Sequence, residues 1–303
     1  MSRYTYGVML MVVSAAAFSA TMILSKLSFV AGSNSLAVNA VRYPVAALVL
    51  VPYALLRPGR MTLAPGARIY TGSFSILILL FSFSYLGSAQ YVDVGLTTLI
   101  AYSSPAWATL LAHLFKLELF TRNRLTGLTF TLAGVWAILG GAKAQGLGMT
   151  EVLGISLAFV AALSLASSNL LGHLATQNVA SHTVSAYVAL SGAVVFPIAA
   201  ASTGMLGFPT SAAALYALGA AAFLAASFLL WIKGLQYCPP ATAALLGTLE
   251  LPYNVVFSVL LIGEVMTWPK GIGALLILLG TLTCTSRPAR SSASAGRSAP
   301  SGS

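Results

Sequence analysis

The sequence has 303 residues, of which 58% are hydrophobic and only 7% are charged. Soluble proteins carry about 25% charged residues, so this chain has too few charges to cover a surface that faces water. The net charge of +10 does not indicate nucleic-acid binding, because most Lys and Arg residues stand singly in short polar gaps. The composition therefore predicts an integral membrane protein whose surroundings are the lipid bilayer, with no nucleic-acid partner.

Ten apolar segments follow one another along the chain, each close to the roughly 20 residues that cross a bilayer as a helix. They cover residues 5–27, 34–56, 68–89, 93–115, 123–142, 151–174, 182–203, 211–233, 239–262 and 268–285. Turn residues separate them, and no gap is long enough for a folded extramembrane domain. The predicted fold class is an all-α integral membrane protein with ten transmembrane helices.

The two ends of the chain differ in character. The first apolar run has features of a signal peptide, but it continues from Tyr4 to Leu27, which is long enough to span the bilayer as an uncleaved helix. Residues 286–303 consist mainly of Ser, Ala, Pro and Arg without an apolar period. They are predicted to form a disordered cytoplasmic tail.

The basic residues predict the orientation in the membrane. With the N-terminus in the cytoplasm, 11 of the 15 Lys and Arg residues fall on the cytoplasmic side. The four on the other side are Lys26, Arg42, Lys143 and Lys270. Because cytoplasmic loops are enriched in Lys and Arg, both termini are expected in the cytoplasm. The expected location is the inner membrane of the cell. Lys26 and Arg42 are expected to reach the outer face with their long side chains, or else to attract an anionic group.

An internal repeat relates the two halves of the chain. The string E-x-x-T-x-x-[RK]-x-x-G-x6-G occurs twice, and matching positions differ by 146. The matching pairs are Tyr91 and Tyr237, Glu118 and Glu264, Thr121 and Thr267, Arg124 and Lys270, Gly127 and Gly273, and Gly134 and Gly280. The repeat predicts a first five-helix unit over residues 1–142, a linker over 143–150 and a second unit over 151–285.

An odd number of helices in each unit makes the second unit enter the membrane upside down. Inverted repeats are a common construction in secondary transporters, where the two halves can exchange conformations around one central site. The sequence therefore favours a transporter or a channel, although any duplicated membrane protein could share this arrangement.

The ten-helix pattern resembles the drug/metabolite transporter superfamily, specifically its EamA-type exporters. The resemblance is carried by LFKLELFTRNRLTGLTFTLAGVWAIL at residues 114–139 and LLIGEVMTWPKGIGALLILLGTL at residues 260–282. Gly263 and Glu264 fit the family pattern, whereas Leu117 replaces the usual glycine before Glu118. The resemblance implies a central cavity with alternating access and export of small metabolites, and among the members the chain is most similar to bacterial amino-acid exporters.

Glu250 is the strongest candidate for a functional side chain. It lies midway along segment 239–262, where a charged carboxylate costs about 3 kcal/mol or more unless it faces a wet or polar interior. Pro252 follows two residues later and leaves backbone carbonyls without partners. Pro105 occupies the corresponding place in the first half, so both prolines are predicted helix breaks. Glu250 is expected either to bind a substrate amine or a proton, or to be a hydrogen-bonded structural group.

Other polar and aromatic side chains are expected at the same depth as Glu250. Rings and dipoles of this kind suit a small zwitterion, although packing and helix–helix hydrogen bonds would use the same residues. The predicted cavity residues besides Glu250 are Tyr102, Ser103, Trp107, Tyr253, Asn254, Ser19, Ser164 and Ser168.

A further set of residues is interpreted as structural. The glycines are expected to allow close helix contact. Glu118 and Glu264 are expected to pair with nearby basic groups at helix ends. The structural set is Glu118, Glu264, Gly127, Gly134, Gly273 and Gly280.

The predicted function is secondary active transport of small metabolites, with amino acids as the leading substrate class. Two cysteines supply no metal-ligand spacing, and the sequence contains neither a Walker A string nor a common hydrolase motif. No enzyme activity, cofactor or metal is therefore expected. A passive channel for small polar solutes, an exporter of drugs or other metabolites, and a non-transporting scaffold stay open as alternatives. The oligomeric state is not determined by the sequence, which is compatible with a monomer.

Overall fold

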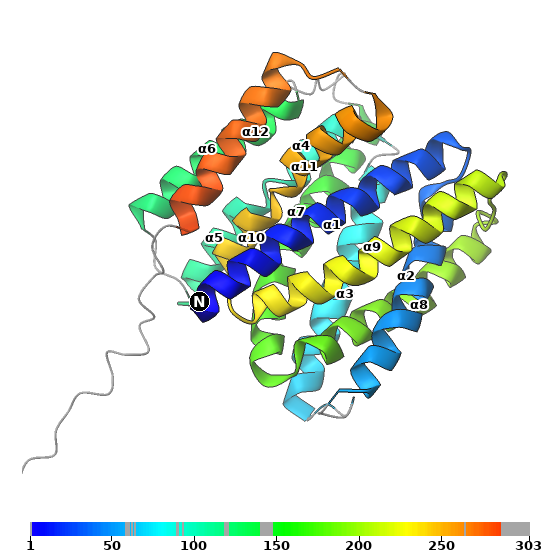
Figure 1. Cartoon of the computed structure of the whole chain (residues 1–303), viewed down its shortest axis with the longest axis horizontal. Coiled ribbons are helices and arrows are strands. Elements are labelled where there is room, and N and C mark those ends of the chain that lie inside the picture. The colour runs from blue at the N-terminus through cyan, green and yellow to red at the C-terminus, as the bar shows by residue number, and fades with distance from the viewer. Residues whose placement is uncertain are drawn as a thin grey trace, which may run out of the picture.

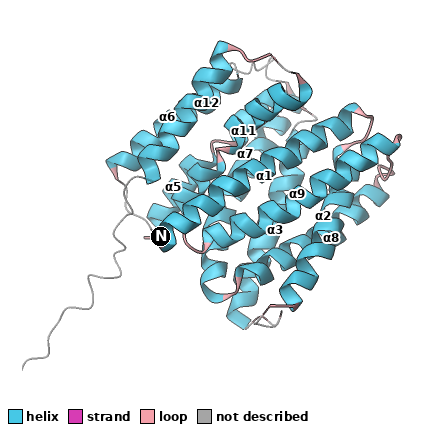
Figure 2. Cartoon of the chain, viewed as in Figure 1, coloured by secondary structure: helices cyan, strands magenta, loops and turns pink. Residues whose placement is uncertain are grey.

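The computed structural model describes residues 2–57, 61, 63, 65–88, 91–92, 94–117, 121–139, 148–263 and 265–285. Within this part of the chain every regular element is a helix and no strand is present (Figure 2). The first half contains α1 (Arg3–Val30), α2 (Ser35–Leu55), α3 (Pro65–Ser88), α4 (Val94–Ala101), α5 (Ser104–Leu114) and α6 (Arg122–Leu139). The second half contains α7 (Met149–Asn178), α8 (Ser181–Ser202), α9 (Ser211–Leu235), α10 (Pro240–Gly247), α11 (Glu250–Phe257), the π-helical η1 (Ser258–Ile262) and α12 (Trp268–Thr285).

Seven helical stretches of the described chain are long and apolar enough to cross a membrane. They are Arg3–Val30, Ser35–Leu55, Gly66–Tyr85, Met149–Gln177, Ser181–Ser202, Ser211–Leu235 and Pro240–Leu261, with Trp268–Thr283 as a shorter apolar helix. The protein is thus a multi-pass helical membrane protein. The three predicted segments that are not among these stretches are 93–115, 123–142 and 268–285, which correspond to α4 with α5, to α6 and to α12.

Two of the predicted segments are broken helices rather than continuous ones. Segment 93–115 separates into α4 and α5 at Tyr102 and Ser103, and segment 239–262 separates into α10 and α11 at Thr248 and Leu249. Each break lies just before a proline that was expected to interrupt the helix. Proline has no N–H to donate to the preceding turn and its ring crowds that turn, so the helix restarts there.

The helices pack in pairs that join the two halves of the chain (Figure 1). The most extensive contacts are those of α1 with α9, α3 with α7, α2 with α8, and α6 with α12. We let α1 to α6 correspond in order to α7 to α12. Exchanging the two halves then converts the pair α1–α9 into the pair α3–α7, and it converts the pairs α2–α8 and α6–α12 each into itself. The contact pattern is therefore that of two similar units related by a two-fold rotation.

The contact between α6 and α12 is unusually close because glycines face each other across it. A Cβ atom on Gly134 would lie 2.6 Å from the carbonyl oxygen of Gly273, and one on Gly280 would lie 2.6 Å from the carbonyl oxygen of Gly127. Gly127 therefore opposes Gly280, and Gly134 opposes Gly273, which requires the two helices to run antiparallel. Small residues let helix backbones approach in this way.

Candidate functional site

The two broken helices place the ends of short helices in the middle of the bundle. At each break a hydroxyl group gives a second hydrogen bond to a carbonyl oxygen that also accepts a backbone N–H. Ser103 Oγ donates to the carbonyl oxygen of Ile100, and Thr248 Oγ1 donates to that of Leu245, both at 2.6 Å. Half-helices that end inside a bundle expose backbone dipoles to a central site, as in many transporters.

Glu250 is the first residue of α11 and lies beside one of these breaks. Its carboxylate is within hydrogen-bonding range of the Tyr102 hydroxyl, at the other break, and of the Asn254 side chain. Ser19 Oγ of α1 donates to Asn254 Oδ1 at 2.7 Å, which leaves the amide nitrogen of Asn254 as the donor for Glu250. The N-terminus of a helix is also a favourable place for a negative charge.

These four side chains come from both halves of the chain. We call Ser19, Tyr102, Glu250 and Asn254 the central polar cluster. Ser19 is fully buried, whereas the other three are only partly buried, so the cluster reaches both the packed interior and an accessible space. The structure thus brings together four of the nine residues that the sequence singled out for a cavity.

Arg42 of α2 belongs to the surroundings of this cluster, which agrees with the second of the two expectations for it, attraction to an anionic group, rather than with a place at the outer face. Its Nη1 donates a hydrogen bond of 3.3 Å to Ser25 Oγ of α1, and its guanidinium interacts electrostatically with Glu250. Ser25 in turn donates to the carbonyl oxygen of Thr21 at 2.7 Å, which fixes the acceptor that Arg42 uses. Arg42 lies seven residues inside α2, about 10 Å from the first residue of that helix at 1.5 Å per residue.

Tyr85 of α3 is a second neighbour that the sequence analysis did not select. Its hydroxyl shares a hydrogen bond of 2.8 Å with Thr98 Oγ1, and it interacts electrostatically with both Tyr102 and Glu250. A signal for Arg42 was present in the sequence, since a charged residue well inside an apolar segment indicates a functional position. Tyr85 carried no such signal, because Tyr is common in membrane helices.

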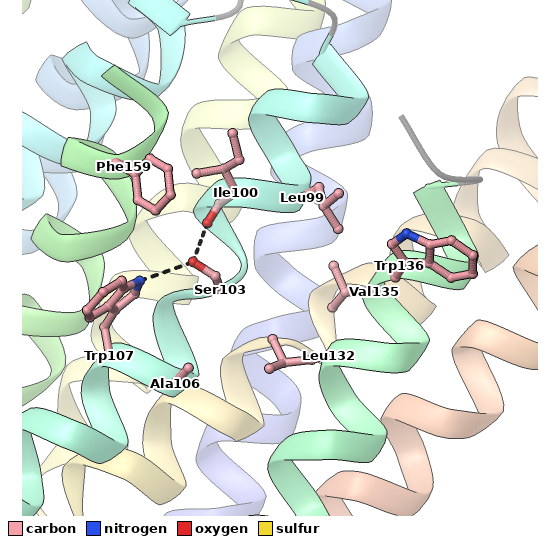
Figure 3. A pocket seen from close by; sticks show the side chains of 9 residues that line it. All are labelled: Leu99, Ile100, Ser103, Ala106, Trp107, Leu132, Val135, Trp136 and Phe159. Carbon is pink, nitrogen blue, oxygen red and sulfur yellow. Dashed lines mark hydrogen bonds between the residues drawn. The ribbon is translucent and has the colours of Figure 1, made fainter. Parts of the chain in front are cut away.

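Ser103 and Trp107 lie apart from the central polar cluster. They line an apolar cavity of about 430 Å³ together with Leu99, Ile100, Ala106, Leu132, Val135, Trp136 and Phe159 (Figure 3). Trp107 Nε1 donates to Ser103 Oγ at 3.3 Å, so both polar groups are engaged with each other (Figure 3). Trp136 and Phe159 are exposed on the outside of the bundle, which makes this cavity apolar and peripheral rather than part of the charged centre.

The remaining predicted residues are distributed around the bundle. Ser164 and Ser168 are buried in α7, and Ser168 Oγ donates to the carbonyl oxygen of Leu165 in its own helix. Tyr253 of α11 packs its ring against Phe257, with ring centroids 6.3 Å apart. Glu118, Glu264 and the tail of residues 286–303 lie outside the described residues. Among the residues that are described, no group of three or more metal-ligating side chains comes together.

The two ends of the bundle are packed differently. At one end α5 contacts α10, and Ala108 of α5, Ala166 of α7 and Ala244 of α10 form one buried cluster. At the other end, the described parts of α4 and α11 have at most marginal contact, as do those of α4 and α1. The tighter end is the one at which α1 begins, because Gly7 packs against Tyr237 and Cys238 just before α10. The central polar cluster lies between these two ends.

These features define a multi-pass membrane protein whose two similar halves meet around broken helices and a buried polar centre. The model of the EamA-like transporter family matches the chain twice, over residues 5–140 and 152–286. The chain therefore belongs to the EamA-like transporter family, whose members are membrane transporters of small solutes.

Comparison with solved structures supports the same fold. A crystal structure of another protein superposes with a TM-score of 0.79 at 19% identity, covering 94% of this chain and 97% of the other. A comparison with curated proteins finds no match.

Proposed function

We propose that this protein is a secondary transporter that exports small polar metabolites, with amino acids as the leading class. Ten membrane crossings, arranged as two inverted five-helix units over residues 1–142 and 151–285, form the transporter. The observation that carries the proposal is the central polar cluster. Both halves of the chain contribute side chains to it, and its carboxylate, Glu250, lies beside one helix break and interacts with Tyr102 at the other. An ionisable group inside a membrane bundle is expected to serve an ion or substrate pathway.

Solute counterflow in proteoliposomes tests the proposal. Vesicles preloaded with unlabelled L-amino acids and diluted into a tritiated L-amino-acid mixture are expected to accumulate label transiently and saturably. A passive channel would show neither saturation nor exchange, and a scaffold would show no uptake above protein-free vesicles. The absence of exchange for this mixture, with exchange of another solute class, would redirect the proposal to a different metabolite or drug.

The protein is proposed to lie in the inner membrane with both termini in the cytoplasm. In this orientation 11 of the 15 basic residues are on the cytoplasmic side. The exposed loop before α9 should then be outside. A Thr210→Cys variant made without Cys238 and Cys284 is expected to react with an impermeant thiol reagent added to intact cells. Labelling of this position only after the cytoplasmic side is opened would contradict the orientation.

With this orientation, the end closed by α5 and α10 faces the cytoplasm, and the protein is in an outward-facing state. A short bifunctional thiol reagent is expected to join Ala108→Cys to Ala244→Cys and to stop counterflow, because the cytoplasmic end must separate during each cycle. Uptake measured before and after crosslinking, in a background without Cys238 and Cys284, checks this prediction.

A matched pair lies at the opposite end. Thr97 and Val255 are 147 positions from Ala244 and Ala108, the same offset as between Pro105 and Pro252. Thr97→Cys with Val255→Cys is expected to crosslink poorly in the absence of substrate, because α4 and α11 have at most marginal contact in the part of the chain described. Equal crosslinking of the two pairs would contradict an outward-facing state.

A further inference from the structure

We propose that Arg42 and Glu250 form the two charged poles of one substrate site, which selects zwitterions over amines and acids. Arg42 would hold the substrate carboxylate, and Glu250 would hold the ammonium group. The inference rests on the proposed transport function and specifies the chemistry of its substrate.

The first support is the state of the Arg42 side chain. Among the described residues its guanidinium has one hydrogen bond, from Nη1 to Ser25 at 3.3 Å, while its Nε is buried and has no partner. A guanidinium has five N–H donors in a planar arrangement that matches a carboxylate in bidentate fashion. A buried donor without an acceptor is unfavourable, and a bound carboxylate would supply that acceptor.

The second support is the relation between the two charges. Arg42 and Glu250 attract each other electrostatically, yet over the described residues no direct ion pair joins them. Glu250 is instead oriented by Tyr102 and Asn254, and Arg42 by Ser25. Each charge therefore has its own hydrogen-bond partners, and the two charges interact electrostatically without a direct ion pair.

The third support is accessibility. Arg42 and Glu250 are both only partly buried, although neither lies at the end of its transmembrane segment. Arg42 lies on the side of Glu250 toward the start of α2, which is the end where α4 and α11 have at most marginal contact in the described residues. A small solute that entered from this looser end would meet Arg42 before it reached Glu250. An α-amino acid carries its carboxylate and ammonium groups on one carbon and matches two nearby poles of opposite charge.

Equilibrium binding to purified protein in detergent tests the inference without requiring transport. A tritiated L-amino-acid mixture is bound to the protein, and L-phenylalanine, phenethylamine or 3-phenylpropionate is added to displace it. The three competitors share a carbon skeleton and differ in charge. The wild-type protein is expected to bind the zwitterion about tenfold to a hundredfold more tightly than either analogue, the range that a lost charged hydrogen bond produces. L-alanine, ethylamine and propionate repeat the comparison with a smaller side chain.

Variants then assign the two poles. In Arg42→Gln the affinity for the amino acid is expected to fall to the affinity for the amine, while the affinity for the amine stays unchanged. Arg42→Lys is expected to restore part of the difference between these two affinities. Glu250→Gln should remove the preference over the acid instead. Lys233→Gln, whose side chain lies over the ring of Tyr6 and away from the cluster, is the control that should keep all preferences.

Three results would overturn the inference. One is a wild-type protein that binds amine or acid as tightly as the amino acid. Another is an Arg42→Gln variant that keeps the preference over the amine. The third is an equal loss for all three ligands in Arg42→Gln, which would make Arg42 a counter-charge of Glu250. Zwitterion-selective binding without counterflow would contradict the transport proposal alone, and if Arg42→Gln does not fold, the wild-type comparison and Arg42→Lys decide.

Discussion

A Glu250→Gln variant is expected to insert and fold normally but to lose most of its transport rate, by about tenfold to a hundredfold. Glutamine keeps the size of the side chain and an oxygen for Tyr102, but it removes the negative charge that would hold a substrate ammonium group or a proton. The initial rate of counterflow, measured from about pH 5 to about pH 9, should also become insensitive to pH if the carboxyl group exchanges protons during the cycle.

Glu151 supplies the matched control, since its carboxylate has a different and purely local role. It accepts a hydrogen bond from the backbone N–H of Gly148 at 3.0 Å, at the start of α7. Glu151→Gln should keep the transport rate and its pH dependence within a factor of about two, because a helix-capping contact affects stability only by roughly 1 kcal/mol. If Glu250→Gln transports like the parent at every pH, Glu250 is a structural polar group.

A Gly134→Ala variant is expected to destabilise the protein by about 1–3 kcal/mol, the usual cost of overpacking. The added methyl group would lie 2.6 Å from the carbonyl oxygen of Gly273 and 2.9 Å from the backbone nitrogen of Ile277. Both are backbone atoms that cannot turn away, so α6 and α12 must separate. A melting temperature several degrees below that of the parent, measured in detergent on monodisperse protein, would show this effect.

Gly271→Ala is the control within the same helix pair. A Cβ atom at this position of α12 would have no neighbour within 4 Å, so alanine should leave the melting temperature unchanged or raise it slightly through its better helix propensity. Equal melting temperatures for the Gly134→Ala and Gly271→Ala variants would contradict the close contact. Gly273→Ala, on the opposing helix, should behave like Gly134→Ala.

Periodicity and composition were sufficient to predict most of the fold. Segments such as 34–56 and 211–233 agree closely with α2 and α9, because long apolar runs bounded by turn residues leave little freedom in a bilayer. The prolines indicated the two helix breaks. They did not show that each break would divide one segment into two short helices, since that depends on how neighbouring helices and hydroxyl groups satisfy the freed backbone.

The grouping of side chains was harder to predict than their depth. Tyr102 and Ser103 are adjacent, and both were expected at the level of Glu250. The break in the helix directs Tyr102 toward Glu250, whereas Ser103 turns toward Trp107 and the apolar cavity. Arg42 was counted with the outer loops because a long basic side chain can extend to an interface. Only the structure shows the hydrogen bond to Ser25 of α1 that retains its guanidinium inside the bundle.

The glycine contact between α6 and α12 has a consequence for the origin of the chain. Each helix presents the same two glycines to the other, so the contact is isologous, as in a homodimer with two-fold symmetry. A single five-helix unit with this glycine spacing could pair with an inverted second copy of itself by the same surface. Joining two such copies in one polypeptide fixes their opposite orientations, and the halves are then free to diverge. The two halves already differ at the breaks, where Glu250 stands two residues before Pro252 and Ser103 stands two residues before Pro105.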